Sequence, residues 1–241
     1  MIIQGKNSVF EALESGTTIN RIYALSNLND GMSNKIIKKA KSKGVRVDFV
    51  SKNILEKYSQ NGKHQGFIAD IVDFEYSSVE DILNVSKQKN TPNFILILDG
   101  IEDPHNFGAI IRSAECLGVD GIIIGKHRAC QVNDTVVRVS SGAICNIKIA
   151  KVTNINQTIQ TLKDNNIWVY ALELGGKTID TVSLKGNIAL VVGSEGKGTS
   201  EQVKKNCDEI VSLQMYGKVN SLNASVATGI GLYEIVRQRK N

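Results

Sequence analysis

Cysteine, histidine, proline and aromatic residues are all scarce in this chain of 241 residues. The four cysteines are widely spaced without a CxxC pair, and the three histidines lack metal-ligand spacing, which predicts reduced thiols, no metal site and a cytoplasmic protein. No run approaches the roughly 18 apolar residues of a membrane helix. The N-terminus also lacks the basic region and long apolar core of a signal peptide. We therefore expect neither membrane insertion nor export.

Two common nucleotide-binding signatures are missing as well. The sequence "VVGSEGKGTS" does not match GxxxxGK[ST], because Val191 stands five residues before Gly196 and because Gly198 follows Lys197. No GxGxxG follows a predicted strand either. These absences disfavour an ordinary kinase, an ATPase or a dinucleotide-dependent enzyme.

Charge is mildly basic and locally clustered. The net charge of +5 permits a polyanionic partner without demanding one. A solvated helix face and a patch that contacts phosphates both explain a cluster of lysines on one helix. An aromatic content of only 5% favours recognition of RNA shape or backbone over base stacking. The cluster falls within one predicted helix and its exit and consists of Lys35, Lys38, Lys39, Lys41, Lys43 and Arg46.

The hydrophobic pattern divides the chain into two α/β domains. Helix and strand patterns alternate through residues 1–75, where Ser8 and Glu11 have the spacing of a capping box that opens a helix. Residues 76–93 are polar, contain at most one short helix and include a proline, which is typical of a linker. We place the larger domain at residues 94–241.

Near-continuous apolar strands separated by amphipathic helices predict a mostly parallel sheet covered on both faces in the larger domain. Ligands of such sheets bind at the carboxyl ends of the strands. The predicted strands are 94–98, 121–124, 146–150, 168–172, 188–192 and 210–213, and the predicted helices are 108–117, 154–166, 199–207 and 222–238.

Three of these strand ends run into polar, glycine-containing sequence. Any one such loop is typical of turns and helix caps, but three on one sheet indicate a functional site. Arg112 lies on an otherwise apolar stretch, where it acts in catalysis, reaches solvent or pairs with Glu102 or Asp103. The three stretches are "DGIEDPHNFGAIIRSAECLG" (99–118), "IALVVGSEGKGTS" (188–200) and "IVSLQMYGKVNSLNASVATGIGLYEIVRQR" (210–239).

Together these three stretches resemble the motifs of the SpoU/TrmH family of RNA ribose 2′-O-methyltransferases. They are similar in detail to the bacterial enzymes that methylate a guanosine of 23S ribosomal RNA. "GKNSVFEAL" and "HQGFIADI" resemble that subgroup's small L30e-like substrate-binding domain. The resemblance implies a SPOUT-type sheet with a deep trefoil knot, S-adenosyl-L-methionine as cofactor, an RNA substrate and a homodimer packed through the knot domain.

The resemblance also implies roles for individual residues. A guanidinium stays charged in proteins, so our hypothesis is that Arg112 clamps the phosphate beside the target ribose and stabilises the forming oxyanion. Four motif residues would orient Arg112 and the substrate, four loop residues would hold the cofactor mainly through backbone groups, and the N-terminal basic cluster would bind RNA. These are Asn106, Glu195, Ser221 and Asn223 for orientation, and Gly193, Leu213, Met215 and Leu222 for the cofactor.

Two other functions remain open at this point. One keeps the chemistry but changes the substrate to a transfer RNA or to another ribosomal RNA position, as in a resistance enzyme. The other is a ribosome-assembly or RNA-binding protein that has kept the fold without catalysis. The presence of all five motif residues argues against the second function, namely Asn106, Arg112, Glu195, Ser221 and Asn223.

Overall fold

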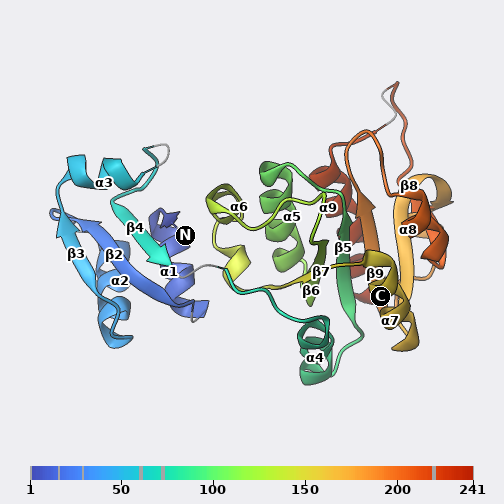
Figure 1. Ribbon diagram of the computed structural model, residues 1–241, viewed down its shortest axis with the longest axis horizontal. Helices are drawn as coiled ribbons and strands as arrows, with labels where there is room; N and C mark the ends of the chain where they lie inside the picture. The colour runs from blue at the N-terminus through green and yellow to red at the C-terminus, as the bar shows by residue number, and fades with distance from the viewer. Residues whose placement is uncertain are drawn as a thin grey trace. The chain divides into compact units, whose positions relative to one another are not determined.

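The structure is a computed structural model that describes residues 2–15, 17–28, 30–59, 62–71, 74–218 and 221–240. The chain forms two compact units (Figure 1). The first contains residues 1–75 and 132–146, and the second contains residues 76–131 and 147–241. Residues 132–146 thus belong to the first unit, whereas the sequence analysis placed them in the larger domain, 94–241.

The first unit is built on a four-stranded mixed sheet of order β1-β4-β2-β3. β4 pairs antiparallel with β1 and β2, and β3 pairs parallel with β2. Helix α1 begins at Lys6, so Ser8 and Glu11 lie inside the helix and do not form the predicted capping box. The elements are β1 (Ile2–Gln4), α1 (Lys6–Ser15), β2 (Ile19–Leu25), α2 (Gly31–Ser42), β3 (Val47–Val50), α3 (Lys52–Tyr58), β4 (Phe67–Ile71), α6 (Asp134–Val139) and η1 (Ala143–Cys145).

The second unit confirms the predicted sheet. Its six strands have the order β10-β8-β9-β5-β6-β7, and all five pairings are parallel. The elements are α4 (Val79–Lys89), β5 (Phe94–Asp99), α5 (Pro104–Cys116), β6 (Gly121–Gly125), β7 (Lys148–Val152), α7 (Ile155–Asp164), β8 (Trp168–Thr178), η2 (Ile179–Thr181), β9 (Ile188–Gly193), α8 (Glu201–Asn206), β10 (Glu209–Ser212) and α9 (Ala224–Lys240).

Helices cover both faces of this sheet because the strands carry apolar side chains on both sides. On one face, residues such as Ile95 and Ile97 share a buried cluster with side chains of α4, α7 and α8. On the other face, α5 and α9 lie side by side (Figure 1), and α9 approaches so closely that a methyl group at Gly231 would lie 3.2 Å from both Leu172 and Leu190. Burial on both faces leaves only the strand ends for chemistry.

Residues 76–93, predicted as a linker, contain helix α4. The helix begins with a capping box between Ser78 and Asp81, and Ile82 is fully buried in the core of the second unit. Its exposed polar face accounts for the linker-like composition. No helix among the described residues is long and apolar enough to cross a membrane.

Candidate functional site

The residues predicted to hold the cofactor come together in one pocket of the second unit, which we call the leucine pocket. Its volume is about 570 Å³, and it lies beside the middle of β8, at the end of β9 and at the start of α9. Its apolar walls come from segments that are far apart in the sequence. All four predicted cofactor residues line it, namely Gly193, Leu213, Met215 and Leu222, together with Leu172, Leu174, Glu173, Ser194, Glu195, Ser221 and Asn223.

One wall of the leucine pocket is the tight loop that follows β9. Ser194 and Gly198 close this loop with two backbone hydrogen bonds of 3.1 and 2.9 Å. Gly193 has no room for a side chain, because a methyl group there would collide with the backbone of Gly198 and Thr199. Gly198 has a φ of +64°, and a methyl group there would strike the carboxylate of Glu173. Glycine at these positions is therefore a steric requirement of the loop.

A hydrogen-bonded network of three predicted site residues borders this loop. Oε1 of Glu195 accepts hydrogen bonds from Nδ2 of Asn106 at 3.1 Å, from Nδ2 of Asn223, and from the backbone nitrogen of Ala224 at 3.1 Å. Nδ2 of Asn223 also donates to Oδ1 of Asn106 at 2.9 Å. The network joins the start of α5, the loop after β9 and the start of α9, so all three sequence motifs meet here.

The leucine pocket is acidic. Glu173 and Glu195 are its only charged residues among the described residues that line it. Oε2 of Glu173 accepts a hydrogen bond of 2.8 Å from the backbone nitrogen of Thr199, which holds the carboxylate beside the loop. An apolar pocket with two carboxylates favours a ligand that is largely apolar and carries a positive charge.

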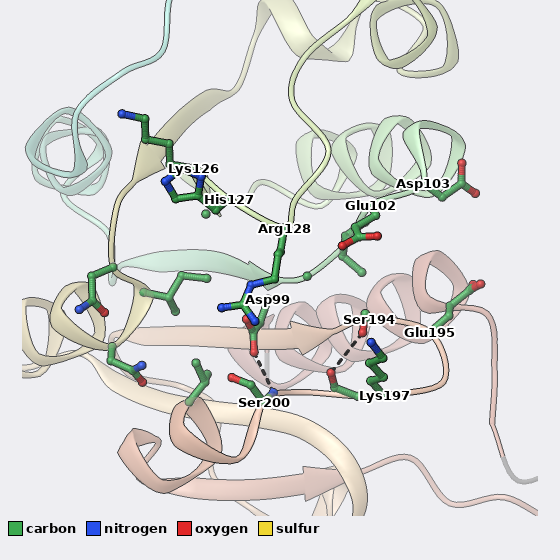
Figure 2. Close-up of a pocket in the computed structure, with 18 of the residues that line it drawn as sticks. Asp99, Glu102, Asp103, Lys126, His127, Arg128, Ser194, Glu195, Lys197 and Ser200 are labelled. Carbon is green, nitrogen blue, oxygen red and sulfur yellow. Dashed lines mark hydrogen bonds between the residues drawn. The ribbon is translucent and has the colours of Figure 1, made fainter.

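A second pocket lies on the other side of the same loop, and we call it the strand-end pocket (Figure 2). Its volume is about 620 Å³, and Ser194, Glu195 and Gly198 line both pockets. It opens where β5, β6, β7 and β9 end, as expected for a parallel sheet. Its charged and imidazole side chains are Asp99, Glu102, Asp103, Lys126, His127, Arg128, Glu195 and Lys197.

The loop after β6 forms one side of the strand-end pocket and is held in place by hydrogen bonds. Nε2 of Gln131 donates to the backbone oxygens of Gly125 at 3.2 Å and Ala129 at 3.1 Å. The backbone nitrogen of Cys130 donates to the oxygen of Ile101 at 2.7 Å, which ties this loop to the loop after β5. Burial and then the charge of Asp103 raise the pKa of the Cys130 thiol, which disfavours the thiolate form that a nucleophilic cysteine requires.

Arg112 lies outside both pockets. It is exposed on α5, six residues after Asn106, and lines a separate pocket of about 370 Å³ with Gly229 and Tyr233 of α9. Within one chain, the structure therefore brings together Asn106, Glu195, Ser221 and Asn223 around the leucine and strand-end pockets but does not bring Arg112 to either.

The predicted RNA-binding cluster lies on and after α2 in the first unit. Two members have carboxylate partners, because Nζ of Lys39 pairs with Glu14 at 2.7 Å and Nε of Arg46 with Asp48 at 2.8 Å. Surface pairs of this kind are weak and open readily to an anionic ligand. The other four members are exposed: Lys35, Lys38, Lys41 and Lys43.

Sequence reasoning missed two parts of this site. Lys126, His127 and Arg128 directly follow the apolar strand "GIIIG", so the logic applied to three strand ends would also have found this fourth one. Glu173 had no comparable signal, because it lies in the middle of β8 and its place beside Thr199 depends on long-range packing.

Comparison with protein families gives two matches that cover most of the chain. Residues 93–233 match the model described as the SpoU rRNA Methylase family. Residues 2–77 match the model for RNA 2′-O ribose methyltransferase substrate binding. A curated relative is YacO of Bacillus subtilis, assigned to the TrmH family of tRNA/rRNA methyltransferases, which is 40% identical over 98% of this chain and 94% of its own length.

Solved structures with the same fold include two that contain S-adenosylmethionine. AviRb from Streptomyces viridochromogenes, a SpoU methyltransferase in complex with AdoMet, has a TM-score of 0.85 at 22% identity over 100% of this chain and 91% of its own. An AdoMet-bound rRNA methyltransferase from Sinorhizobium meliloti has a TM-score of 0.81 at 24% identity over 98% of this chain and 86% of its own. Because these two alignments cover nearly the whole chain, both units share their fold with the solved structures.

Proposed function

The chain belongs to the SpoU rRNA methylase family, and we propose that it transfers a methyl group from S-adenosyl-L-methionine to the ribose 2′-hydroxyl of a guanosine in 23S ribosomal RNA. The class of enzyme follows from the two family matches, which pair a methylase with an RNA 2′-O ribose methyltransferase substrate-binding region. The guanosine, the 23S target and action in the cytoplasm are the finer parts of the proposal.

The observation that carries the proposal is the Glu195 network between two adjoining pockets. A methyl transfer brings a donor and an acceptor to one point, with the reacting atoms about 3–3.5 Å apart before reaction. The leucine and strand-end pockets share the loop 194–198, and the amides of Asn106 and Asn223 meet at Glu195 beside it. Residues from all three motifs therefore surround the place where two ligands can meet.

The leucine pocket fits the cofactor by its chemistry. S-adenosylmethionine supplies the methyl group when bound, and it combines apolar surface with positive charge. The apolar walls around Leu213 and Leu222 suit the first property, and the carboxylates of Glu173 and Glu195 suit the second. Gly193 lets the loop backbone approach without a side chain in the way. In this proposal Gly193, Leu213, Met215 and Leu222 hold the cofactor.

The side chains around Glu195 orient the acceptor. Asn106 is only 8% exposed and is fixed by its bonds to Glu195 and Asn223, so its amide is positioned before substrate arrives. Such preorganised polar groups stabilise charge that develops on the attacking oxygen. Ser221 lines the leucine pocket from the segment before α9, and we assign it a place beside the same oxygen.

Arg112 needs a second copy of the chain to take part. The dimer in this proposal packs through α9, where Val226, Ile230 and Tyr233 are 49%, 44% and 59% exposed. Their spacing of four and three residues places them on one helix face, and Tyr233 lines the same pocket as Arg112. A partner that covers this face brings Arg112 to a dimer interface, where its guanidinium can clamp the phosphate beside the target ribose.

The dimer is tested by molar mass. Ile230→Glu is expected to convert a dimer into a monomer in light scattering and to reduce methyl transfer, while Lys87→Glu, at an exposed position of α4 on the other face of the sheet, is expected to do neither. Mixing Arg112→Ala protein with Glu195→Ala protein is expected to restore part of the activity that each lacks alone. A wild-type monomer with full activity would contradict the assignment of Arg112.

The first unit supplies RNA affinity in this proposal, as an L30e-like domain. Its exposed lysines on α2 can neutralise phosphates, and their contribution depends on salt. We also propose that the segment between β10 and α9 threads through the second unit as the family's trefoil knot. Support comes from residues of that segment, Leu213, Met215 and Leu222, which line one pocket with the loop after β9.

The deciding experiment uses purified protein, labelled S-adenosylmethionine, and unmodified 23S ribosomal RNA and total transfer RNA in parallel. Digestion to nucleosides and mass analysis then identify the labelled product. Label in 2′-O-methylguanosine from ribosomal RNA alone is the expected result. Label from transfer RNA would move the substrate to the alternative that the tRNA/rRNA name of YacO leaves open, and cofactor binding without label in either RNA or in a ribosome-assembly particle would indicate a non-catalytic protein.

A further inference from the structure

The strand-end pocket has a position and a composition that suit one half of the reaction. It adjoins the leucine pocket across the loop 194–198, and Asn106 lines it on the side of the Glu195 network. If the cofactor occupies the leucine pocket, as proposed above, an acceptor that reaches the same network enters from the strand-end pocket. A volume of about 620 Å³ is in the range of small-ligand sites.

The charges in this pocket are of both signs, which favours a ligand with donors and acceptors over a simple anion. Arg128 and Lys197 supply donors, while Asp99, Glu102 and Asp103 supply acceptors. Guanine offers a matching pattern, because its N1–H and exocyclic amine donate hydrogen bonds and its O6 and N7 accept them. An arginine that donates to O6 and N7 is the commonest specific contact to this base.

Arg128 is held in an unusual backbone conformation. Its φ of +51° is in the left-handed region, which is unfavourable for a side chain of this size and recurs at functional sites. The bonds of Gln131 and Cys130 described above fix the loop around it. Figure 2 shows the Arg128 side chain extending toward Asp99, whereas Lys126 points away from that carboxylate.

Glu102 is the carboxylate best placed to accept from a base. Asp99 already accepts a hydrogen bond of 2.8 Å from the backbone nitrogen of Ser200, and Asp103 accepts one of 2.9 Å from that of His105 at the start of α5. Among the described residues, no such bond occupies Glu102, which is exposed at the rim.

We propose that the strand-end pocket binds the base of the target nucleotide and that Arg128 and Glu102 select guanine. Arg128 donates to O6 and N7, and Glu102 accepts from N1–H and the exocyclic amine. This inference rests on the proposed function, because that function supplies the reason for an acceptor nucleotide beside the cofactor.

The test measures nucleotide binding without catalysis. Saturation-transfer NMR with guanosine and adenosine monophosphates is expected to show tighter binding of the guanine nucleotide by the full chain. Arg128→Gln and Glu102→Gln are each expected to reduce this preference at least about fivefold, the lower end of one bidentate base contact. The affinity for S-adenosylmethionine, measured by calorimetry, is expected to stay unchanged.

Two further variants serve as controls, one for the loss of a charge outside the pocket and one for misfolding. Lys185→Gln removes a charge at an exposed position outside the pocket and is expected to leave the preference intact. Arg128→Gly removes the guanidinium while suiting the positive φ, so loss of preference in this variant does not reflect misfolding. Equal binding of the two nucleotides by the wild type, or an unchanged preference in the Arg128 and Glu102 variants, would overturn the proposal.

Methyl transfer to ribosomal RNA, measured with the same proteins, separates this inference from the proposed function. Wild-type protein that methylates guanosine while the Arg128 and Glu102 variants keep their nucleotide preference would refute only the pocket assignment. A guanine preference that depends on Arg128 and Glu102, in a protein that methylates no RNA, would support the pocket and refute the proposed function.

Discussion

Replacing Glu195 by alanine tests whether the network at the centre of the site also stabilises the second unit. One oxygen of Glu195 accepts hydrogen bonds from the side-chain amides of Asn106 and Asn223 and from the backbone nitrogen of Ala224. The substitution removes all three acceptor contacts at once. The side-chain oxygen of Asn106 keeps its hydrogen bond from Asn223, so the substitution leaves unpaired donors but no unpaired acceptor.

The expected loss follows from the exposure of each donor. Asn106 is 8% exposed and Ala224 is 6% exposed, so water replaces the lost acceptor poorly at both residues, whereas Asn223 is exposed. An unsatisfied buried donor costs about 1–3 kcal/mol, so we expect the two buried donors together to cost about 2–6 kcal/mol. For a protein of this size, that loss lowers the unfolding temperature by about 4–24 °C.

Fluorescence of Trp168 offers a local assay. It is the single tryptophan of the chain and lies on β8, so its thermal transition reports on the second unit. Glu201→Ala is the matched control, because Glu201 is 79% exposed and pairs only at the surface with Lys204, which predicts a change below about 0.5 kcal/mol. A transition for Glu195→Ala within error of this control would refute the view that the network holds the three motifs together.

Three other changes test separate parts of the structure. Gly193→Ala is expected to weaken S-adenosylmethionine binding at least about fivefold in calorimetry, because overpacking costs about 1–3 kcal/mol and the added methyl would collide with the loop backbone that borders the leucine pocket; normal affinity would contradict the loop's steric role. Lys38→Glu is expected to weaken RNA binding and to lower the slope of log affinity against log salt by roughly one, with the affinity for the cofactor unchanged, and an unaltered slope would remove Lys38 from the RNA surface. Partial burial, and then Asp208, raise the pKa of the Cys207 thiol to about 12, so iodoacetamide at pH 8.5 should label exposed Cys116 first and Cys207 only as rising pH forms its thiolate; equal rates in mass spectrometry would contradict the raised pKa of Cys207.

The sheet of the second unit could be predicted because its strands are buried on both faces. Such strands are short, near-continuous apolar runs, and the predicted 188–192 corresponds to β9 at Ile188–Gly193. The ends of the helices were harder to predict than the strands. Helix α5 begins at Pro104, after Asp103 as N-cap, rather than at the predicted residue 108. The sequence does contain a helix-start signal four residues earlier, an aspartate at the N-cap followed by a proline at the first helical position.

What could not be predicted depends on contacts between distant parts of the chain. Residues 132–146 group with the first unit, where the backbone nitrogen of Ile2 donates to Asp134 at 3.1 Å. No local pattern encodes a bond across 132 positions. For the same reason, the motifs predicted Arg112 as a site residue but did not predict its separation from the leucine pocket, since residue type carries no information about placement.

The strand order of the second unit has a consequence for how the protein is made. β9 lies between β5 and β8, yet it is synthesised after both. Until β9 arrives, a nascent chain exposes one edge of β5, a strand of five buried residues ending in Asp99, and exposed apolar edges promote aggregation. The central strand of the sheet is therefore inserted late, and the loop that follows it forms later still. If the leucine pocket holds the cofactor, as proposed, its binding must wait until the start of α9 has been made, so chains that terminate earlier are expected not to be rescued by S-adenosylmethionine.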